Sequence, residues 1–308
     1  MADANLAFIL DAVRAALARR GWAPSEISVL SPPSARKRGR ATFRVALAEG
    51  GTVEAVKARW LESSAEAARL FAIRATLDDA FAPPIVADDR LLLEVWIEGA
   101  RVAALGGDPT SGAIAEEAGA ILGRLHAHPI DAAPAHSSTA RWRHDAESDL
   151  AALSAAGRLT RSDVAVLAAT LAANDPRHTA LALVHRDFCG ENIVRDARDR
   201  LRVIDNEWLE VGPAGFDLGR SQCRWPMDAR TWRRFLAGYA SATPLDEPSL
   251  AFWQVVAALW SARIRLGSPH VAEPLAVVQQ LAREASAAGR SRTRRSGGSA
   301  RSTGEHGA

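Results

Sequence analysis

"LVHRDFCGEN", residues 183–192, follows an apolar run with a cluster of polar side chains. Asp187 and Asn192 stand five positions apart in it, and a second polar segment, "VIDNE", brings Asp205 soon after. The residues between Asn192 and Asp205 predict a short strand–turn–strand hairpin. Such a hairpin would place Asn192 beside Asp205, with both close to Asp187.

This grouping predicts a metal site next to an acid–base residue. Mg²⁺ accepts one or two carboxylates and completes its shell with substrate phosphates and water, which suits Asn192 and Asp205. A third, ionised carboxylate can orient an incoming hydroxyl and accept its proton, which suits Asp187. A single Asp or Asn at a strand end is more often a cap or a turn residue. Three of them in this arrangement favour a functional site.

The first hundred residues predict a small sheet with a charged pair. "TFRVAL" and "VEAVKAR" indicate two strands joined at "EGG", and "SSAEAARLFAIRATLDDAF" indicates a helix after them. Glu66 falls on the apolar stripe of that helix, where a carboxylate needs a partner, and Lys57 is the candidate. Only Lys37 and Lys57 are lysines among 38 basic residues. The alternatives are an exposed strand lysine, and Glu62 in place of Glu66.

The chain divides by composition into two lobes and a tail. Residues 1–98 contain strands and one main helix besides an amphipathic N-terminal helix, and residues 99–288 contain mostly Ala/Leu-rich helices. Residues 289–308 hold five Arg and one Glu without large apolar side chains, so we expect a disordered basic tail. The fold class expected is therefore α+β, with a small lobe built on an antiparallel sheet and a larger, mostly helical lobe.

With these motifs in place, the chain resembles the aminoglycoside phosphotransferase and choline kinase family. The resemblance rests on "HRDFCGEN" and "VIDNE", on Lys57 in a strand with Glu66 on the next helix, and on "LLLEVWIEG" leading out of the small lobe. "AGAILGRLHAHP" and "GPAGFDLGR" also resemble segments of that family. It covers about residues 30–225 and implies a two-lobed, protein-kinase-like fold with the nucleotide in the cleft.

The resemblance also implies a role for each motif residue. Asp187 would be the catalytic base, and Asn192 and Asp205 would bind Mg²⁺. Lys57, held by Glu66, would contact the α- and β-phosphates of ATP. Two further roles complete the set: Glu94 and the neighbouring backbone would border the adenine pocket, unless this is an ordinary strand end, and Asp217 would brace the catalytic loop.

Other residues near these motifs have weaker signals. The segment "PPSARKRGRATF" has one glycine, Gly39, among basic residues, so it is either a phosphate loop that uses side-chain charge or a solvated basic loop. His185 is expected to brace the loop rather than bind a metal, because no His/Cys set for Zn²⁺ surrounds it. Cys189 is expected to be a small apolar filler. For the acceptor, the candidate lining residues are Glu207, Glu210, Trp225, Trp232, Trp253 and Trp260, with core packing as the alternative for the tryptophans.

These features predict an ATP- and Mg²⁺-dependent phosphotransferase that acts on a hydroxyl of a small molecule such as an aminoglycoside, amino alcohol or sugar. The alternative is a nucleotide-binding pseudokinase or regulatory module. A protein kinase is disfavoured, because the 12 residues from Asp205 to Asp217 are too few for a long activation segment. Without a membrane-length apolar run or an export signal, we expect a cytoplasmic protein. Contacts with nucleic acid are expected only from the tail.

Overall fold

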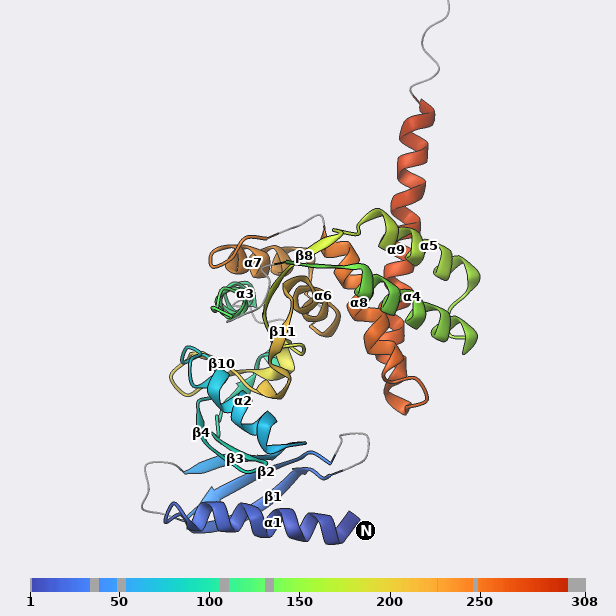
Figure 1. Cartoon of the computed structure of the whole chain (residues 1–308). Coiled ribbons are helices and arrows are strands. Elements are labelled where there is room, and N and C mark those ends of the chain that lie inside the picture. Colours follow the sequence, from blue (N-terminus) through green and yellow to red (C-terminus); the bar gives the residue numbers. More distant parts are fainter. Residues whose placement is uncertain are drawn as a thin grey trace, which may run out of the picture.

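The computed structural model describes residues 2–33, 39–48, 54–105, 111–130, 136–225, 227–245 and 249–298. It has two lobes: a sheet with its helices, and a larger body of helices from which the C-terminal helix extends (Figure 1). The α+β, kinase-like fold expected from the sequence is confirmed. No helix in these ranges is long and apolar enough to cross a membrane.

The small lobe is a five-stranded antiparallel sheet in the order β1-β2-β3-β5-β4, with a helix against each face. Its elements are α1 (Ala2–Ala18), β1 (Pro24–Ser31), β2 (Ala41–Leu47), β3 (Ala55–Trp60), α2 (Ser64–Arg74), β4 (Pro84–Asp88) and β5 (Leu91–Val95).

Side chains alternate between the two faces of this sheet, as the period of two requires. Leu91 and Leu93 pack with α1, whereas Leu92 packs with α2 and the large lobe. In β3, Val56, Ala58 and Trp60 join the α1 side. The residues between them, Lys57 and Arg59, line the cleft between the lobes. The alternation therefore delivers two cations to one place.

The large lobe begins with a short strand and turn and continues as helices around two small sheets, β10-β9-β6 and β11-β8-β7. Its elements are β6 (Ala100–Arg101), η2 (Val102–Leu105), α3 (Ser111–His126), β7 (His136–Ser138), α4 (Ala140–Ala155), α5 (Arg161–Ala173), β8 (His178–Val184), η3 (Gly190–Asn192), β9 (Ile193–Arg195), β10 (Leu201–Val203), η4 (Asn206–Trp208), β11 (Glu210–Pro213), α6 (Ala214–Arg224), α7 (Ala229–Ala240), α8 (Leu250–Arg263), η6 (Pro269–Val271) and α9 (Ala272–Gly298).

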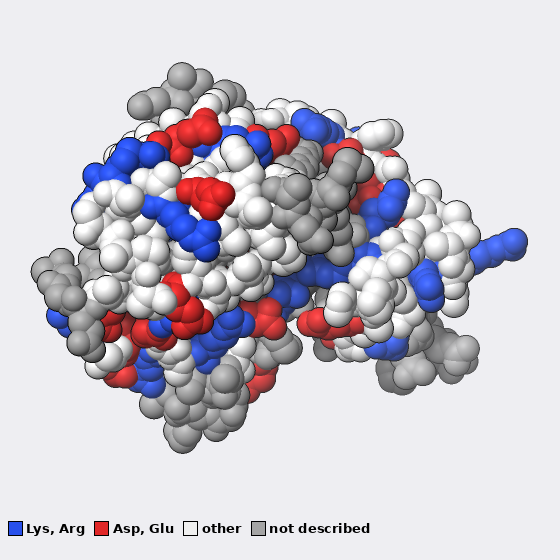
Figure 2. All heavy atoms as spheres, turned by 90° about the horizontal axis from the view of Figure 1, so that it is seen from below, with Lys and Arg blue, Asp and Glu red and all other residues white. Residues whose placement is uncertain are grey.

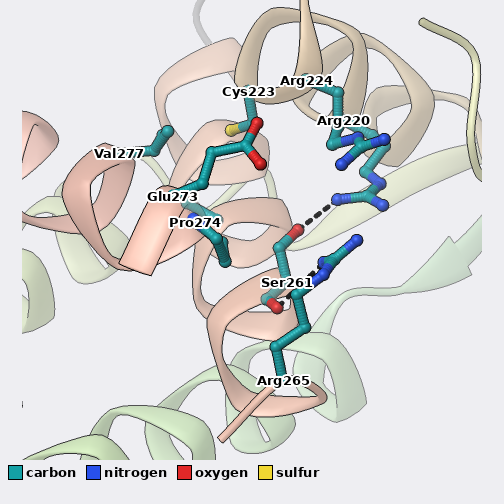
Figure 3. Close-up of a pocket in the computed structure, with 9 residues that line it drawn as sticks. Arg220, Cys223, Arg224, Ser261, Arg265, Glu273, Pro274 and Val277 are labelled. Carbon is teal, nitrogen blue, oxygen red and sulfur yellow. Dashed lines mark hydrogen bonds between the residues drawn. The ribbon is translucent and has the colours of Figure 1, made fainter. Parts of the chain in front are cut away.

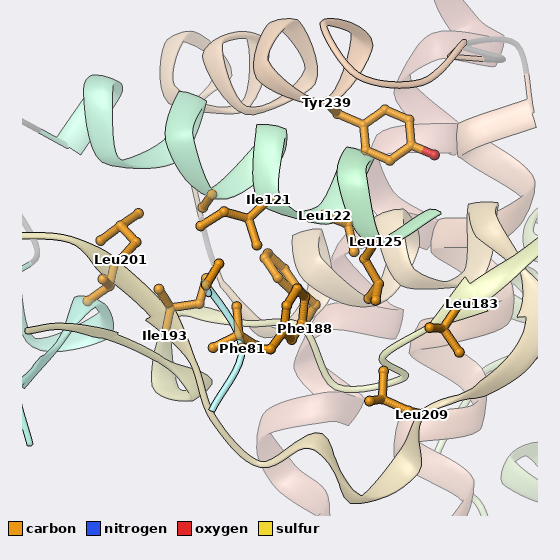
Figure 4. Packing of buried hydrophobic residues seen from close by; sticks show 14 of the residues in the cluster. Phe81, Ile121, Leu122, Leu125, Leu183, Phe188, Ile193, Leu201, Leu209 and Tyr239 are labelled. Atoms are coloured by element: carbon orange, nitrogen blue, oxygen red, sulfur yellow. The ribbon is translucent and has the colours of Figure 1, made fainter. Parts of the chain in front are cut away.

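One apolar core links the two lobes beneath the cleft (Figure 4). Leu70 of α2 and Phe81 reach it from the small-lobe side, and Ile121 and Leu122 of α3 from the other. Phe188, directly after Asp187, is fully buried in the same cluster. The polar loop is thus anchored through an apolar neighbour, which fixes where Asp187 can point.

Helices α3 and α7 approach closely at two glycines. A Cβ at Gly119 would overlap the backbone carbonyl of Phe235, and a Cβ at Gly238 would overlap that of Glu116. Neither obstacle is a flexible side chain, so the contact requires glycine on both helices. This contact holds α3 in place, and α3 packs in the same apolar core as Phe188.

The sequence predicts one boundary after residue 98 and another before residue 289. Residue 98 lies between β5 of the first sheet and β6, which pairs with β9 of the large lobe. The disorder expected of residues 289–308 stays a prediction. Helix α9 continues to Gly298, so the predicted tail boundary at residue 289 lies inside this helix. Residues 299–308 lie outside the described residues.

Candidate active site

The backbone of the loop that follows β8 is held by the carboxylate of Asp217. Asp217, in the first turn of α6, accepts hydrogen bonds from the backbone N–H groups of His185 (2.6 Å) and Arg186 (2.7 Å). His126 of α3 lies 3.2 Å from the same carboxylate. Burial acts to raise the pKa of Asp217, but the His126 and backbone hydrogen bonds outweigh it and lower that pKa. Asp217 therefore stands where the predicted bracing residue was expected.

The first residues of this loop are packed, not solvated. His185 is fully buried, with Nε2 3.0 Å from Oδ1 of Asn206, and its Nδ1 accepts the Asp187 N–H at 3.3 Å. This geometry fits the bracing role expected of His185. Cys189 is also buried, and its desolvation raises the pKa of the thiol. The two contacts of His185 and the burial of Cys189 hold the backbone on either side of Asp187 in place.

The hairpin brings Asp187, Asn192 and Asp205 to one cleft, as the sequence predicted. Ile193 of β9 pairs with Val203 of β10, and the Ile204 N–H donates to the Asn192 carbonyl at 2.9 Å. The Asn192 side-chain amide donates to the Asp187 carbonyl oxygen (2.9 Å) and carboxylate (3.2 Å). Its Oδ1 is thereby turned away from Asp187, as a metal ligand would require. All three side chains line the same cleft.

Two non-glycine residues of this segment have a left-handed backbone. Arg186 and Asp205 both have φ of +66°. Both residues carry a Cβ, which glycine lacks. Each left-handed backbone conformation therefore costs about 1–3 kcal/mol of free energy. Such strain persists where the surrounding contacts impose it, and here those contacts are the Asp217 carboxylate and the β9–β10 hairpin.

Asp205 meets two cations from the opposite lobe. Its Oδ1 lies 2.8 Å from Lys57 Nζ and 2.9 Å from a terminal nitrogen of Arg59. Burial opposes ionisation, but the charges of Arg59 and Lys57 hold the pKa of Asp205 below its ordinary range. In return, burial and the neighbouring Arg59 lower the pKa of Lys57 despite the attraction of Asp205. Lys57, Arg59 and Asp205 thus form one charged cluster in the cleft, to which both lobes contribute.

Arg59 is the residue that sequence reasoning missed. It is 1% exposed, and it contacts Glu94 (2.5 Å), Asp205 and Glu207. Its position two residues after Lys57 in a strand was the available signal, because side chains at i and i+2 share a face. Arg59 therefore joins the small lobe to the segment that contains Asp205 and Glu207.

The expected Lys57–Glu66 pair is not the pairing seen in the structure. Among the described residues, Glu66 forms its ion pair with Arg40, whose guanidinium also lies 4.5 Å from the Trp208 ring centroid. The second oxygen of Glu66 accepts the Glu62 N–H at 3.0 Å. Arg40 directly precedes β2 and also lies 3.9 Å from Glu62, which comes just before α2. Lys57 turns to Asp205 instead.

Glu94 also differs from its expected setting. Its side chain is 1% exposed and lies between Arg59 (2.5 Å) and Arg74 (2.7 Å). Burial acts against its charge, yet the charges of Arg74 and Arg59 lower its pKa from 4.5 to about 2. The carboxylate is therefore engaged by two buried arginines, although the Glu94 position still lines the cleft. Arg74 is a charged residue on the buried stripe of α2, a signal that the sequence did offer.

The cleft itself has a volume of about 1340 Å³ and lies between the lobes. The space-filling view from the small-lobe side shows basic side chains gathered in a hollow, with acidic ones at its rim (Figure 2). Gly39 has φ of +74° at its edge. Arg36, Lys37 and Arg38 of the predicted phosphate loop lie outside the described residues.

The donor set fits a magnesium ion shared with a nucleotide. No group of three or more His, Cys, Asp or Glu among the described residues could hold a metal by itself. Asp205 and the Oδ1 of Asn192 would offer such a cation two oxygen ligands on one side of the cleft. A hard cation that takes few protein oxygens and completes its shell with phosphates and water matches this set.

The predicted acceptor residues divide between cleft and core. Glu207, Glu210 and Trp260 line the cleft. Trp253 is 1% exposed within the α8 core, which is the packing alternative. The last two, Trp225 and Trp232, both pack on Phe235 at centroid distances of 6.3 and 5.2 Å.

Comparison with known families agrees with this geometry. The model of the APH family, the phosphotransferase enzyme family, matches residues 35–253. The chain belongs to this family. The expectation that it is an enzyme, a phosphotransferase, is thereby confirmed. No curated protein matches the chain significantly.

Solved structures show the same fold at low identity. The macrolide 2′-phosphotransferase from Brachybacterium faecium is 20% identical, with a TM-score of 0.62 over 88% of this chain and 98% of its own. The choline kinase from Cryptosporidium parvum Iowa II is 12% identical, with a TM-score of 0.57 over 88% of this chain and 90% of its own. The ADP-bound aminoglycoside phosphotransferase APH(2″)-Ib is 16% identical, with a TM-score of 0.58 over 90% of this chain and 96% of its own.

Proposed function

We propose that this phosphotransferase transfers the γ-phosphoryl group of Mg·ATP to a hydroxyl of a small molecule. The observation that carries the proposal is the convergence of Asp187, Asn192, Asp205 and Lys57 on one cleft between the lobes. A solved structure of the same fold, the aminoglycoside phosphotransferase APH(2″)-Ib, holds ADP, which supports a nucleotide in this cleft. Phosphoryl transfer depends on positioning and charge neutralisation, and the cleft supplies both.

Lys57 is the cation that would bind the nucleotide phosphates. It is mobile enough to change partners, because its ammonium is a point charge on a flexible stem. Its lowered pKa follows from burial and from Arg59, so a triphosphate entering the cleft would stabilise the charged form. Arg59 would stay with Glu94 and Glu207 and keep the floor of the site in place.

Asn192 and Asp205 would hold Mg²⁺, which would offset the negative charge of the nucleotide phosphates. Asp187 would align the acceptor. Its Oδ1 accepts from Arg220 at 2.8 Å and its Oδ2 from Asn192 at 3.2 Å, so the carboxylate has one fixed orientation. The acceptor oxygen bonds to the γ-phosphorus as the bond to the β,γ-bridging oxygen breaks. The acceptor proton passes to Asp187, and ADP leaves.

The test compares Asp187→Asn with a matched Asp→Asn change on the neighbouring hairpin. Asp199 lies at the β9–β10 turn with a side chain 75% exposed, paired only with Arg195 among the described residues. We expect Asp187→Asn to lower kcat by about 10²- to 10⁴-fold while ATP affinity stays within about twofold, because proton acceptance is lost and nucleotide contacts are kept. Asp199→Asn should behave as wild type. Equal rates in wild type and Asp187→Asn would contradict the assigned role.

The second candidate is a nucleotide-binding module without catalysis. The observation behind it is the pairing of Glu66 with Arg40 rather than with Lys57. Calorimetry with and without Mg²⁺ separates the two functions. Metal-dependent ATP binding with phosphorylated product supports the kinase, whereas metal-independent binding without turnover supports the module.

A further inference from the structure

The acceptor side of the cleft is crowded with arginines. Arg220 of α6 and Arg265, just after α8, both line the cleft next to Asp187. They also line a small cavity of about 10 Å³ behind it, together with Arg224. The close-up shows the guanidinium groups of Arg220 and Arg265 turned toward one another beside Ser261 (Figure 3). Positive charge therefore concentrates where the acceptor must enter.

Four of the acidic residues near these arginines already form ion pairs; Glu273, which lines the small cavity, is not one of the four. Glu210 pairs with Arg186 at 2.7 Å, Glu207 pairs with Arg59, and Glu191 pairs with Arg224 at 2.6 Å. Asp187 pairs with Arg220. Their negative charges are thus matched within the protein and offer little attraction to a cationic acceptor.

Arg265 differs from the neighbouring arginines because it has no ion pair among the described residues. Among the described residues, Arg265 donates one hydrogen bond, to the Ser261 carbonyl at 3.2 Å, and no carboxylate lies within ion-pair range of its guanidinium. Burial and the like charges of Arg220 and Arg224 lower the pKa of Arg265, although the charges of Asp187 and Glu273 act to raise it. The buried Nε atoms of Arg220 and Arg224 also have no hydrogen-bond partner among these residues. Arg220 and Arg224 have carboxylate partners in Asp187 and Glu191, whereas Arg265 has none within ion-pair range among the described residues, so an anionic ligand would supply the counter-charge that it lacks.

An aromatic wall borders the same place. Trp260 of α8 lines the cleft, and the guanidinium carbons of Arg220 and Arg186 lie 5.1 and 5.5 Å from its ring centroid. With two cations already on this ring, a third, on the substrate, would be repelled. The ring fits instead against the apolar part of a ligand whose charge is negative.

We propose that the acceptor alcohol carries an anionic group, a carboxylate or a phosphate, that Arg265 binds beside Arg220 while the hydroxyl reaches Asp187. Arginine suits either group because its planar fork donates two parallel hydrogen bonds. The same charges would select against polycationic acceptors, since a wrong charge in the site costs affinity. The inference rests on the proposed function and narrows its substrate class.

The test is a panel of alcohols sorted by charge, incubated with Mg·ATP and analysed for product by mass spectrometry. The anionic arm has hydroxy acids and sugar phosphates separately, the neutral arm has sugars and polyols, and the cationic arm has amino alcohols, aminoglycosides and macrolides. We expect product from the anionic arm alone, and its two halves show whether carboxylate or phosphate is preferred. Product mainly from the neutral or cationic arm overturns the inference but leaves the proposed function standing. No product from any arm counts against both.

Variants then locate the anion site. Arg265→Gln should raise KM for the best anionic acceptor by about 10- to 100-fold, the value of a charge-assisted hydrogen bond, with KM for ATP unchanged. Arg265→Lys, which keeps the charge but loses the fork, should lie between. The control is Arg263→Gln on the same helix, 49% exposed and 3.9 Å from Asp149. If Arg265→Gln and Arg263→Gln give the same acceptor KM, Arg265 does not bind the acceptor.

Discussion

Replacing Glu94 with Gln tests what its buried carboxylate does. The side chain lies between Arg59 and Arg74, and the two guanidiniums are 2% and 0% exposed. Glutamine has nearly the same shape but no charge. The variant therefore leaves two buried cations with less compensation and changes little else in the packing. We expect a clear loss of stability with only a small direct effect on nucleotide binding.

The size of that loss can be worked from two directions. The pKa of Glu94 falls from 4.5 to about 2 in the folded protein, a difference that corresponds to about 3 kcal/mol at 1.36 kcal/mol per unit. Breaking a buried ion pair by removing one partner costs about 3–5 kcal/mol. Both figures predict that Glu94→Gln unfolds about 3 kcal/mol more easily, which lowers Tm by about 5–10 °C for a chain of this size.

The pH dependence has a defined sign. Because the folded pKa of Glu94 is depressed, its stabilisation is fully present above about pH 4.5 and is lost as pH falls toward about 2. The difference in Tm between wild type and Glu94→Gln should therefore be largest at neutral pH and smaller at pH 4. Thermal unfolding followed by circular dichroism at both values measures it.

The control and the refutation use the same assays. Glu98→Gln removes a carboxylate that pairs with Arg44 at 3.0 Å but is 72% exposed, so it should change stability by less than about 1 kcal/mol. If Glu94→Gln melts like wild type while KM for ATP rises tenfold, the carboxylate acts on the nucleotide. The structural role derived from Arg59 and Arg74 would then be wrong.

Two further substitutions test the support of the catalytic loop. Asp217→Asn keeps one acceptor oxygen where two backbone N–H groups need both, so it should cost about 1–3 kcal/mol and lower kcat at least tenfold, measured by thermal unfolding and steady-state kinetics; unchanged kcat would show that Asp187 is held by other contacts. Gly119→Ala should cost about 1–3 kcal/mol because its Cβ meets the Phe235 carbonyl, whereas Gly112→Ala, whose nearest neighbour is 3.9 Å away, should melt within about 2 °C of wild type. Equal melting of these two variants would contradict the close α3–α7 contact.

The sequence by itself determined the polar motif and the elements that carry it. The spacing of Asp187, Asn192 and Asp205 predicted a hairpin, and β9 pairs with β10 as that pattern requires. The period of two in the strands and the apolar stripe of α2 predicted the small lobe, because local patterning depends on neighbours in the chain. The family resemblance, rather than local patterning, implied that Asp217 would brace the loop, and Asp217 lies in the first turn of α6.

Only the tertiary structure decided which cation meets which carboxylate. Lys57 and its partner Asp205 are 148 positions apart, and Glu66 pairs with Arg40, which is 26 positions away. An ion pair forms where folding brings charges within a few Å and removes water, and neither condition is written in local sequence. Arg59, Arg74 and Arg265 acquire their importance in the same way: burial and the surrounding charges, rather than residue type, set what each arginine can bind.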